Sequence, residues 1–136
     1  MNNIKIVVLS VILLTCLNAC TITEPQYTTS ATIYLINETN VVVKSDTSLD
    51  YVIQPGDTLI HTESYTSVYK NKPSINNYDP FSPAGNIFIY GDNSQCELGL
   101  SNIENYENRK EVAPLEFEFT FRFTEEKRQN AEPCNL

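Results

Sequence analysis

The stretch that most restricts the fold is residues 115–123, LEFEFTFRF, in which apolar and polar residues alternate strictly. A strand points successive side chains to opposite faces, whereas a helix would spread the apolar members of this run around its circumference. The apolar members are Leu115, Phe117, Phe119, Phe121 and Phe123. The run therefore predicts a β-strand with one face buried in a hydrophobic core.

Several other short segments are rich in β-branched and aromatic residues and predict further strands: 32–36, 41–44, 51–53, 58–61, 67–69 and 86–90. Residues 37–40 and 54–57 are typical of turns, and the second has Pro then Gly at the central positions of a type II turn. Thr124, followed by two glutamates, predicts the N-cap of a short helix that ends near Ala131. We therefore expect an all-β fold, either an antiparallel sandwich of about seven strands or a small barrel, with one C-terminal helix.

Two polar segments without a regular period, 71–85 and 99–114, are predicted to be long loops. Long ordered loops often carry function, so Tyr78 and Phe81 in the first loop are candidate exposed contact residues. The alternative is that both rings pack beneath the loop as a satellite of the core.

The first twenty residues, MNNIKIVVLSVILLTCLNAC, are typical of a secretory signal. The apolar run 6–17 would span only about 18 Å as a helix, which is too short for a hydrocarbon core of about 30 Å. Residues 17–20, LNAC, resemble the lipobox of bacterial lipoproteins, whose cysteine receives a diacylglyceryl group and becomes the mature N-terminus. Cys20 is therefore the predicted lipidation site. The alternative is ordinary cleavage near Ala19, which would leave Cys20 as a thiol.

On this interpretation, residues 1–19 are the signal peptide, 20–30 are the lipidated cysteine and a polar tether, and 31–136 form the sandwich domain. The expected location is the outer membrane of the cell, through the N-terminal lipid, with either the periplasmic or the surface face possible. Cys96 and Cys134 then remain in an oxidising compartment, where we expect them to form a disulfide bond. Such a bond would stabilise the fold by roughly 4 kcal/mol in the chain-entropy model.

The chain has 136 residues and a formal net charge of −8 at pH 7. Proteins that bind phosphate backbones need a positive surface, so nucleic acid is not an expected partner.

The sequence contains few candidate catalytic residues. His61 is the only histidine, so triads and two-histidine metal sites are disfavoured, and a structural histidine is the simpler interpretation. Glu116 and Glu118 lie roughly 6.6 Å apart on one strand face, a spacing that a glycosidase pair could use but that any such pair on a strand shares. We therefore expect no catalytic residues.

Calcium could use oxygens in the turn 91–94 or around Asn76, Asn77 and Asp79, but neither segment matches a calcium-loop pattern. We expect no metal and no cofactor.

The chain resembles small lipoproteins of Bacteroidota-type bacteria that combine a lipobox, a short tether and an immunoglobulin-like β-sandwich. The residues that carry this resemblance are 17–20, 51–60, 87–96 and 119–131. The resemblance implies a location and a fold but no catalytic residues. The expected function is a non-enzymatic binding module for a protein or glycan partner. The alternative is an accessory structural subunit of a larger envelope complex.

Overall fold

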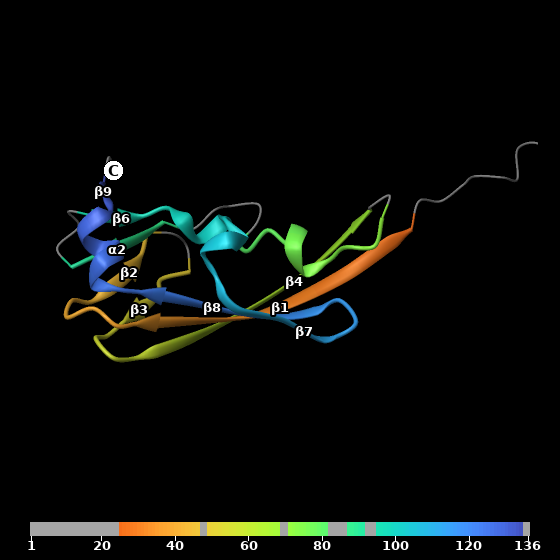
Figure 1. The fold of residues 1–136 in the computed structure, drawn as a ribbon, viewed down its shortest axis with the longest axis horizontal. Helices are drawn as coiled ribbons and strands as arrows, with labels where there is room; N and C mark the ends of the chain where they lie inside the picture. Colours follow the sequence, from red (N-terminus) through yellow and green to blue (C-terminus); the bar gives the residue numbers. More distant parts are fainter. Residues whose placement is uncertain (1–24, 47–48, 69–70, 82–86, 92–94, 135–136) are drawn as a thin grey trace, which may run out of the picture.

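A computed structural model describes residues 25–46, 49–68, 71–81, 87–91 and 95–134. The predicted signal peptide, the lipidation site Cys20 and the first part of the tether lie outside these residues. Within them the chain forms nine strands, three short 3-10 helices and one α-helix (Figure 1).

The first sheet has four strands in the order β4-β1-β8-β7. They are β1 (Gln26–Asn37), β4 (Thr58–Val68), β7 (Glu107–Ala113) and β8 (Glu116–Phe123). Strand β1 is antiparallel to β4 but parallel to β8. The sheet is therefore mixed, which corrects the purely antiparallel expectation. A hairpin would force neighbouring strands to be antiparallel, but β1 and β8 are far apart in sequence and carry no such constraint.

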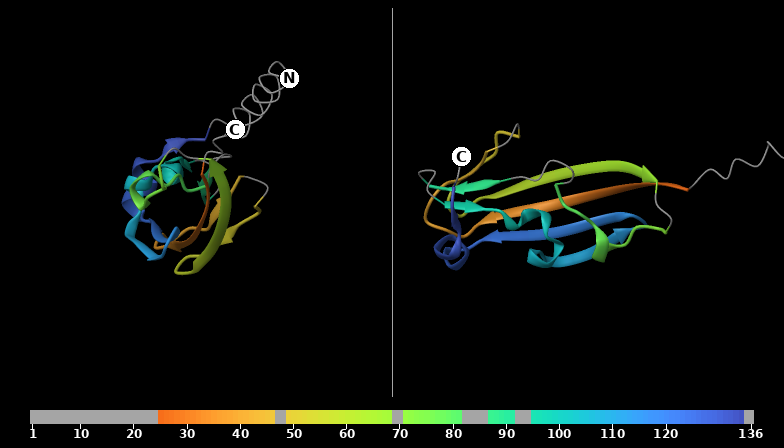
Figure 2. Two further views of the ribbon diagram at one scale, coloured as in Figure 1. Left: turned by 90° about the vertical axis from the view of Figure 1, so that its right-hand side faces the viewer. Right: turned by 90° about the horizontal axis from the view of Figure 1, so that it is seen from above.

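The second sheet has five strands in the order β3-β2-β5-β6-β9, and all its pairs are antiparallel. Its strands are short: β2 (Val43–Ser45), β3 (Val52–Ile53), β5 (Phe88–Tyr90), β6 (Gln95–Glu97) and β9 (Glu132–Pro133). The second sheet lies near the end where β1 and β8 finish (Figures 1 and 2). Two sheets and one short helix confirm the predicted all-β sandwich.

The core is centred on the inward face of β8. Phe117, Phe119, Phe121 and Phe123 are each at most 1% exposed, as the alternating pattern predicts. They pack against the inward residues of β1, among them Ile33 and Leu35, which are fully buried.

Leu115 does not belong to this strand. Strand β8 begins at Glu116, and Leu115 adopts a φ of 65° in the turn that follows Pro114. The apolar pattern extended one residue too far because the turn places an aliphatic residue where glycine or asparagine is more usual.

The part of the first sheet beyond the second sheet is covered by the segment 71–81 and by the residues that precede β7. These segments contain η1 (Ile75–Asn77), η2 (Gly99–Ser101) and η3 (Ile103–Asn105). The Tyr78 ring packs 5.3 Å from that of Phe119, and the Tyr106 ring packs 5.3 Å from that of Phe121. Aromatic residues from irregular segments therefore complete the core.

Three predictions about where elements begin and end were wrong. Strand β1 begins at Gln26, so residues 26–30 belong to the sheet and not to the tether. The predicted strands 58–61 and 67–69 are not separate, because residues 58–68 form the single strand β4, while residue 69 lies outside the described part. The second predicted loop contains β7, an exposed edge strand with two register shifts. Because neither face of β7 is buried, its sequence carries no alternating signal.

The predicted turn at residues 54–57 and the predicted helix are confirmed. Gly56 has a φ of 84°, and the Asp57 N–H donates to the Gln54 carbonyl at 3.0 Å, as in a type II turn. Helix α2 (Glu125–Asn130) begins after Thr124, whose hydroxyl oxygen accepts from the Lys127 N–H at 3.2 Å. This bond satisfies one of the free N–H groups of the first turn.

The predicted disulfide is also present. Cys96 in β6 is bonded to Cys134, which follows β9, across a sequence separation of 38. The bond fixes the C-terminal segment against the second sheet.

Candidate binding pocket

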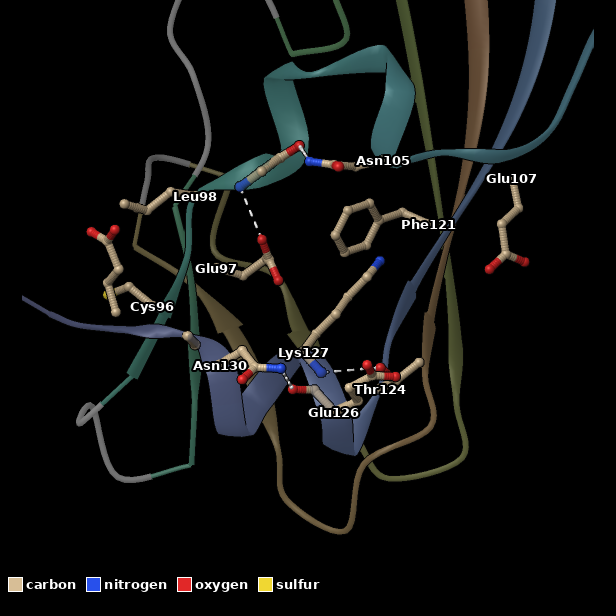
Figure 3. Close-up of a pocket in the computed structure, with 13 residues that line it drawn as sticks. Cys96, Glu97, Leu98, Asn105, Glu107, Phe121, Thr124, Glu126, Lys127 and Asn130 are labelled. Carbon is tan, nitrogen blue, oxygen red and sulfur yellow. Dashed lines mark hydrogen bonds between the residues drawn. The ribbon is translucent and has the colours of Figure 1, made fainter.

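A pocket of about 570 Å³ lies between β6, β8 and α2, at the end of the sandwich where β8 runs into the helix (Figure 3). The described residues that line it are Cys96, Glu97, Leu98, Gly99, Asn105, Glu107, Phe121, Thr124, Glu126, Lys127, Asn130, Ala131 and Glu132. Its volume falls within the range of small-molecule sites.

Lys127 reaches from α2 into this pocket toward Phe121 (Figure 3). Its Nζ lies 3.8 Å from the centroid of the Phe121 ring and donates to the Arg122 carbonyl at 2.9 Å. Burial lowers the pKa of Lys127 below its ordinary value, while the carboxylates of Glu97 and Glu107 act in the opposite direction. The pocket thus contains an ammonium group on an aromatic face.

Glu97 forms one wall. Its Oε1 accepts from the Gly99 N–H at 2.9 Å, and its Oε2 accepts from the Tyr90 hydroxyl at 3.2 Å. Burial, and then the charge of Glu97, raise the pKa of Tyr90 well above its ordinary value. The phenol therefore stays protonated and keeps the carboxylate in place.

Gly99 allows this wall to form. A Cβ at this position would lie 2.4 Å from Asn105 Nδ2 and 2.9 Å from Glu97 Oε1. Asn105 uses the space to donate from Nδ2 to the Gly99 carbonyl at 2.8 Å. Any larger residue at position 99 would push the Asn105 and Glu97 side chains out of position.

The disulfide bond adjoins the pocket through Cys96, the neighbour of Glu97 in β6. Cys96 lines the pocket together with Ala131 and Glu132, which lie just before Cys134. Of the two cysteines predicted to pair, Cys96 lines the pocket, and no local pattern in the sequence predicts a site beside it.

Lys127 and Phe121 were not recognised as site residues from the sequence. One signal was available: Lys127 occupies the third helical position after the Thr124 cap, where a capping box would have Glu or Gln. A cation in the first turn also opposes the helix dipole. The other lining residues come from separate segments, and no local pattern connects them.

A second polar cluster surrounds His61, which is 9% exposed. Its Nδ1 lies 3.0 Å from the Tyr51 hydroxyl and its Nε2 lies 3.2 Å from Glu63 Oε2. Its ring stacks on that of Phe81, with the two centroids 4.6 Å apart. Both ring nitrogens thus have protein partners, which is the environment of a structural histidine.

The structure does not expose Tyr78 and Phe81 as contact residues. They are 6% and 3% exposed, and both belong to the core, which corrects the binding-loop expectation. The Tyr78 hydroxyl donates to Glu63 Oε1 at 2.8 Å. Phe81 adopts a φ of 59° and donates its N–H to Glu63 Oε2 at 3.1 Å. The loop is closed onto β4 because Glu63 accepts from both residues.

The paired carboxylates of β8 lie outside the pocket, on the polar face of the strand. Glu116 is exposed, and Glu118 forms an ion pair with Lys110 at 2.7 Å.

Of the two calcium candidates, residues 92–94 lie outside the described part. In the other, Asn77 Oδ1 accepts from the Ser74 N–H at 2.8 Å. In the described part of the chain, no group of three or more His, Cys, Asp or Glu residues could hold a metal ion.

A scan against models of known protein families, a search of curated proteins and a search of solved structures found no match to this chain. Among the helices of the described residues, none has the length and apolar character needed to cross a membrane.

Proposed function

We propose that this chain is a lipid-anchored lipoprotein of the cell envelope, attached to the outer membrane through Cys20, and that its sandwich is a non-enzymatic binding module. The lipobox-like residues 17–20 support the anchor. The pocket beside α2 is the proposed binding site.

The observation that carries this proposal is the position of the pocket relative to the start of β1. The last residue pair of β1 and β8 joins Asn37 to Phe123, and Thr124, which follows, lines the pocket. The start of β1, where the chain enters the sheet, lies at the end of the sheet opposite α2 (Figure 1). A strand of 12 residues spans roughly 40 Å. A protein held at Cys20 could therefore present the pocket away from the membrane.

The test of the anchor is Cys20→Ala in the full chain, with Cys16→Ala in the apolar run as the matched control. We expect the first variant to leave the membrane fraction and the control to stay in it. Membrane attachment of Cys20→Ala equal to that of the unchanged chain would contradict the proposal.

The side of the membrane that carries the domain is tested by digesting intact and lysed cells with a broad-specificity protease. Release of peptides from residues 71–81 by intact cells would place the domain on the surface. Protection in intact cells, with cleavage after lysis, would place it in the periplasm.

A second candidate function, as an accessory subunit of an envelope complex, is favoured by β4. This strand has 11 residues, lies at the edge of the first sheet and pairs only with β1 in the described structure. Its outward side chains Thr58, Ile60, Thr62, Ser64 and Thr66 are exposed and uncharged. Such an edge can accept a strand from a partner. Crosslinking followed by purification should recover a stoichiometric partner if this second candidate is right.

A further inference from the structure

The pocket already contains the interactions that recognise an alkylammonium group. The Lys127 Nζ lies 3.8 Å from the centroid of the Phe121 ring, which is a cation–π contact. Glu97 and Glu107 attract the same charge. Here the ammonium group belongs to the protein's own Lys127, on helix α2 at the edge of the open pocket.

The remaining lining offers mainly hydrogen-bond acceptors. Asn105 and Asn130 each use their side-chain N–H on a backbone carbonyl, that of Gly99 at 2.8 Å and that of Glu126 at 3.0 Å. Each amide keeps its oxygen and its second N–H for a ligand, so the excess of acceptors comes from the carboxylates of the lining. Among the described lining side chains Lys127 is the one cation, and one of its hydrogens is already donated to Arg122. A ligand that donates hydrogen bonds therefore fits better than one that accepts them.

The net charge of the lining also favours a cationic ligand. Four carboxylates line the pocket, on Glu97, Glu107, Glu126 and Glu132, against the single ammonium of Lys127. Glu107 is also paired with Arg122 at 3.0 Å, so the other three carry the excess negative charge. An anionic ligand would be repelled, whereas a cation would be attracted.

We propose that the pocket binds an alkylammonium group, and that Lys127 occupies part of the site until the ligand's ammonium competes with it for the Phe121 ring. The proposal rests on the proposed binding function and gives it a ligand class. Leu98, which is 51% exposed at the pocket, supplies an apolar contact for the alkyl chain of the ligand.

The test is calorimetric titration of the full-length protein in detergent, at physiological salt, with 1,8-diaminooctane. The matched control ligand is 1,8-octanediol, which has the same alkyl chain without the charges. We expect saturable binding of the diamine and no binding of the diol. Absence of diamine binding, or equal binding of the diol, would overturn the proposal.

Lys127→Met gives the sharpest test, because a lysine that competes with the ligand and a lysine that assists it predict opposite changes in diamine affinity. Methionine keeps most of the apolar stem but removes the competing ammonium, so diamine affinity should rise by about threefold or more, as expected for a cation–π contact released to the ligand. Weaker binding of the diamine by Lys127→Met would show that the lysine assists the ligand, and would overturn the proposal.

Glu126→Gln tests the lining charge, with Glu116→Gln as the control. Both remove one exposed carboxylate, but Glu116 lies at the start of β8, away from the pocket. We expect several-fold weaker diamine binding for Glu126→Gln and unchanged binding for Glu116→Gln. An equal loss in both variants would indicate a general charge effect and would overturn the site.

The source of the ammonium group is distinguished by comparing the diamine with a short peptide that carries lysine, and with the same peptide carrying norleucine. Tighter binding of the lysine peptide than of the diamine would identify the group as a partner's side chain, and tighter binding of the diamine as a free amine. The binding measurements with the diamine and with the peptides do not depend on the membrane fractionation of Cys20→Ala. The ligand proposal and the anchor proposal can therefore fail separately.

Discussion

The hydroxyl group of Tyr78 donates a hydrogen bond of 2.8 Å to Glu63, and this bond joins the segment 71–81 to β4. The same carboxylate accepts the Phe81 N–H at 3.1 Å and lies 3.2 Å from the His61 imidazole. Together with Tyr65, whose hydroxyl donates to the Asp79 carbonyl at 2.8 Å, this carboxylate holds in place the segment that covers the core where the second sheet does not reach.

Glu63→Ala should lower the free energy of unfolding by about 1–3 kcal/mol, because it leaves buried donors without an acceptor. Tyr78→Phe removes one bond and should cost about 1 kcal/mol. Urea denaturation measures both values. Thr62→Ala, on the exposed face of the same strand, is the control and should stay within about 0.5 kcal/mol of the unchanged protein. An equally small effect of Glu63→Ala would contradict the role of this carboxylate.

Replacing Cys96 and Cys134 together by serine should lower the free energy of unfolding by roughly 4 kcal/mol, because the bond restricts the unfolded chain. Denaturation with and without reductant provides an independent comparison. The double variant should be insensitive to reductant, while the unchanged protein should lose stability when reduced. Equal stability of oxidised and reduced protein would contradict the prediction.

Stability should fall as the pH rises above about 10. Burial raises the pKa of Tyr78, Tyr90 and Tyr106 well above the ordinary tyrosine value. In the unfolded chain these phenols lose their protons near pH 10, while in the folded protein they keep them. Their contribution is thus complete below that pH and is lost above it. Unfolding free energies from about pH 8 to about pH 11, with tyrosinate absorbance, measure the effect. A smaller loss is expected for Tyr106→Phe, and an identical loss would argue against this cause.

Gly99→Ala should disturb the pocket without opening the core. Its Cβ would lie 2.4 Å from Asn105 Nδ2, so the Asn105 side chain must move. We expect a changed amide resonance for Asn105 and several-fold weaker binding of the diamine, with circular dichroism unchanged. Ser101→Ala, at the exposed end of the same 3-10 helix, should leave the amide resonance and the binding as they are. An unmoved Asn105 resonance in Gly99→Ala would show that the wall tolerates the methyl group.

The elements with strong local signals could be predicted, and those defined by tertiary contacts could not. The alternation around Phe119 and the cap at Thr124 act within a few residues, so the sequence shows them directly. The burial of Tyr78 depends on Glu63 and on β8, which are distant in the chain. The pocket is the extreme case, because Lys127 becomes a site residue only when β8 and α2 bring it over Phe121.

The parallel pairing of β1 with β8 has a kinetic consequence. The ion pair between Glu38 and Arg122 crosses 84 residues of chain, and every contact of β1 with β8 requires a comparably long loop to close. Such contacts slow folding, since chain entropy is lost before they form. Strand β8 carries four of the core phenylalanines, yet it is among the last strands to be synthesised. Until it docks between β1 and β7, the nascent sheet exposes an apolar face, and this is the period in which the chain is most exposed to aggregation.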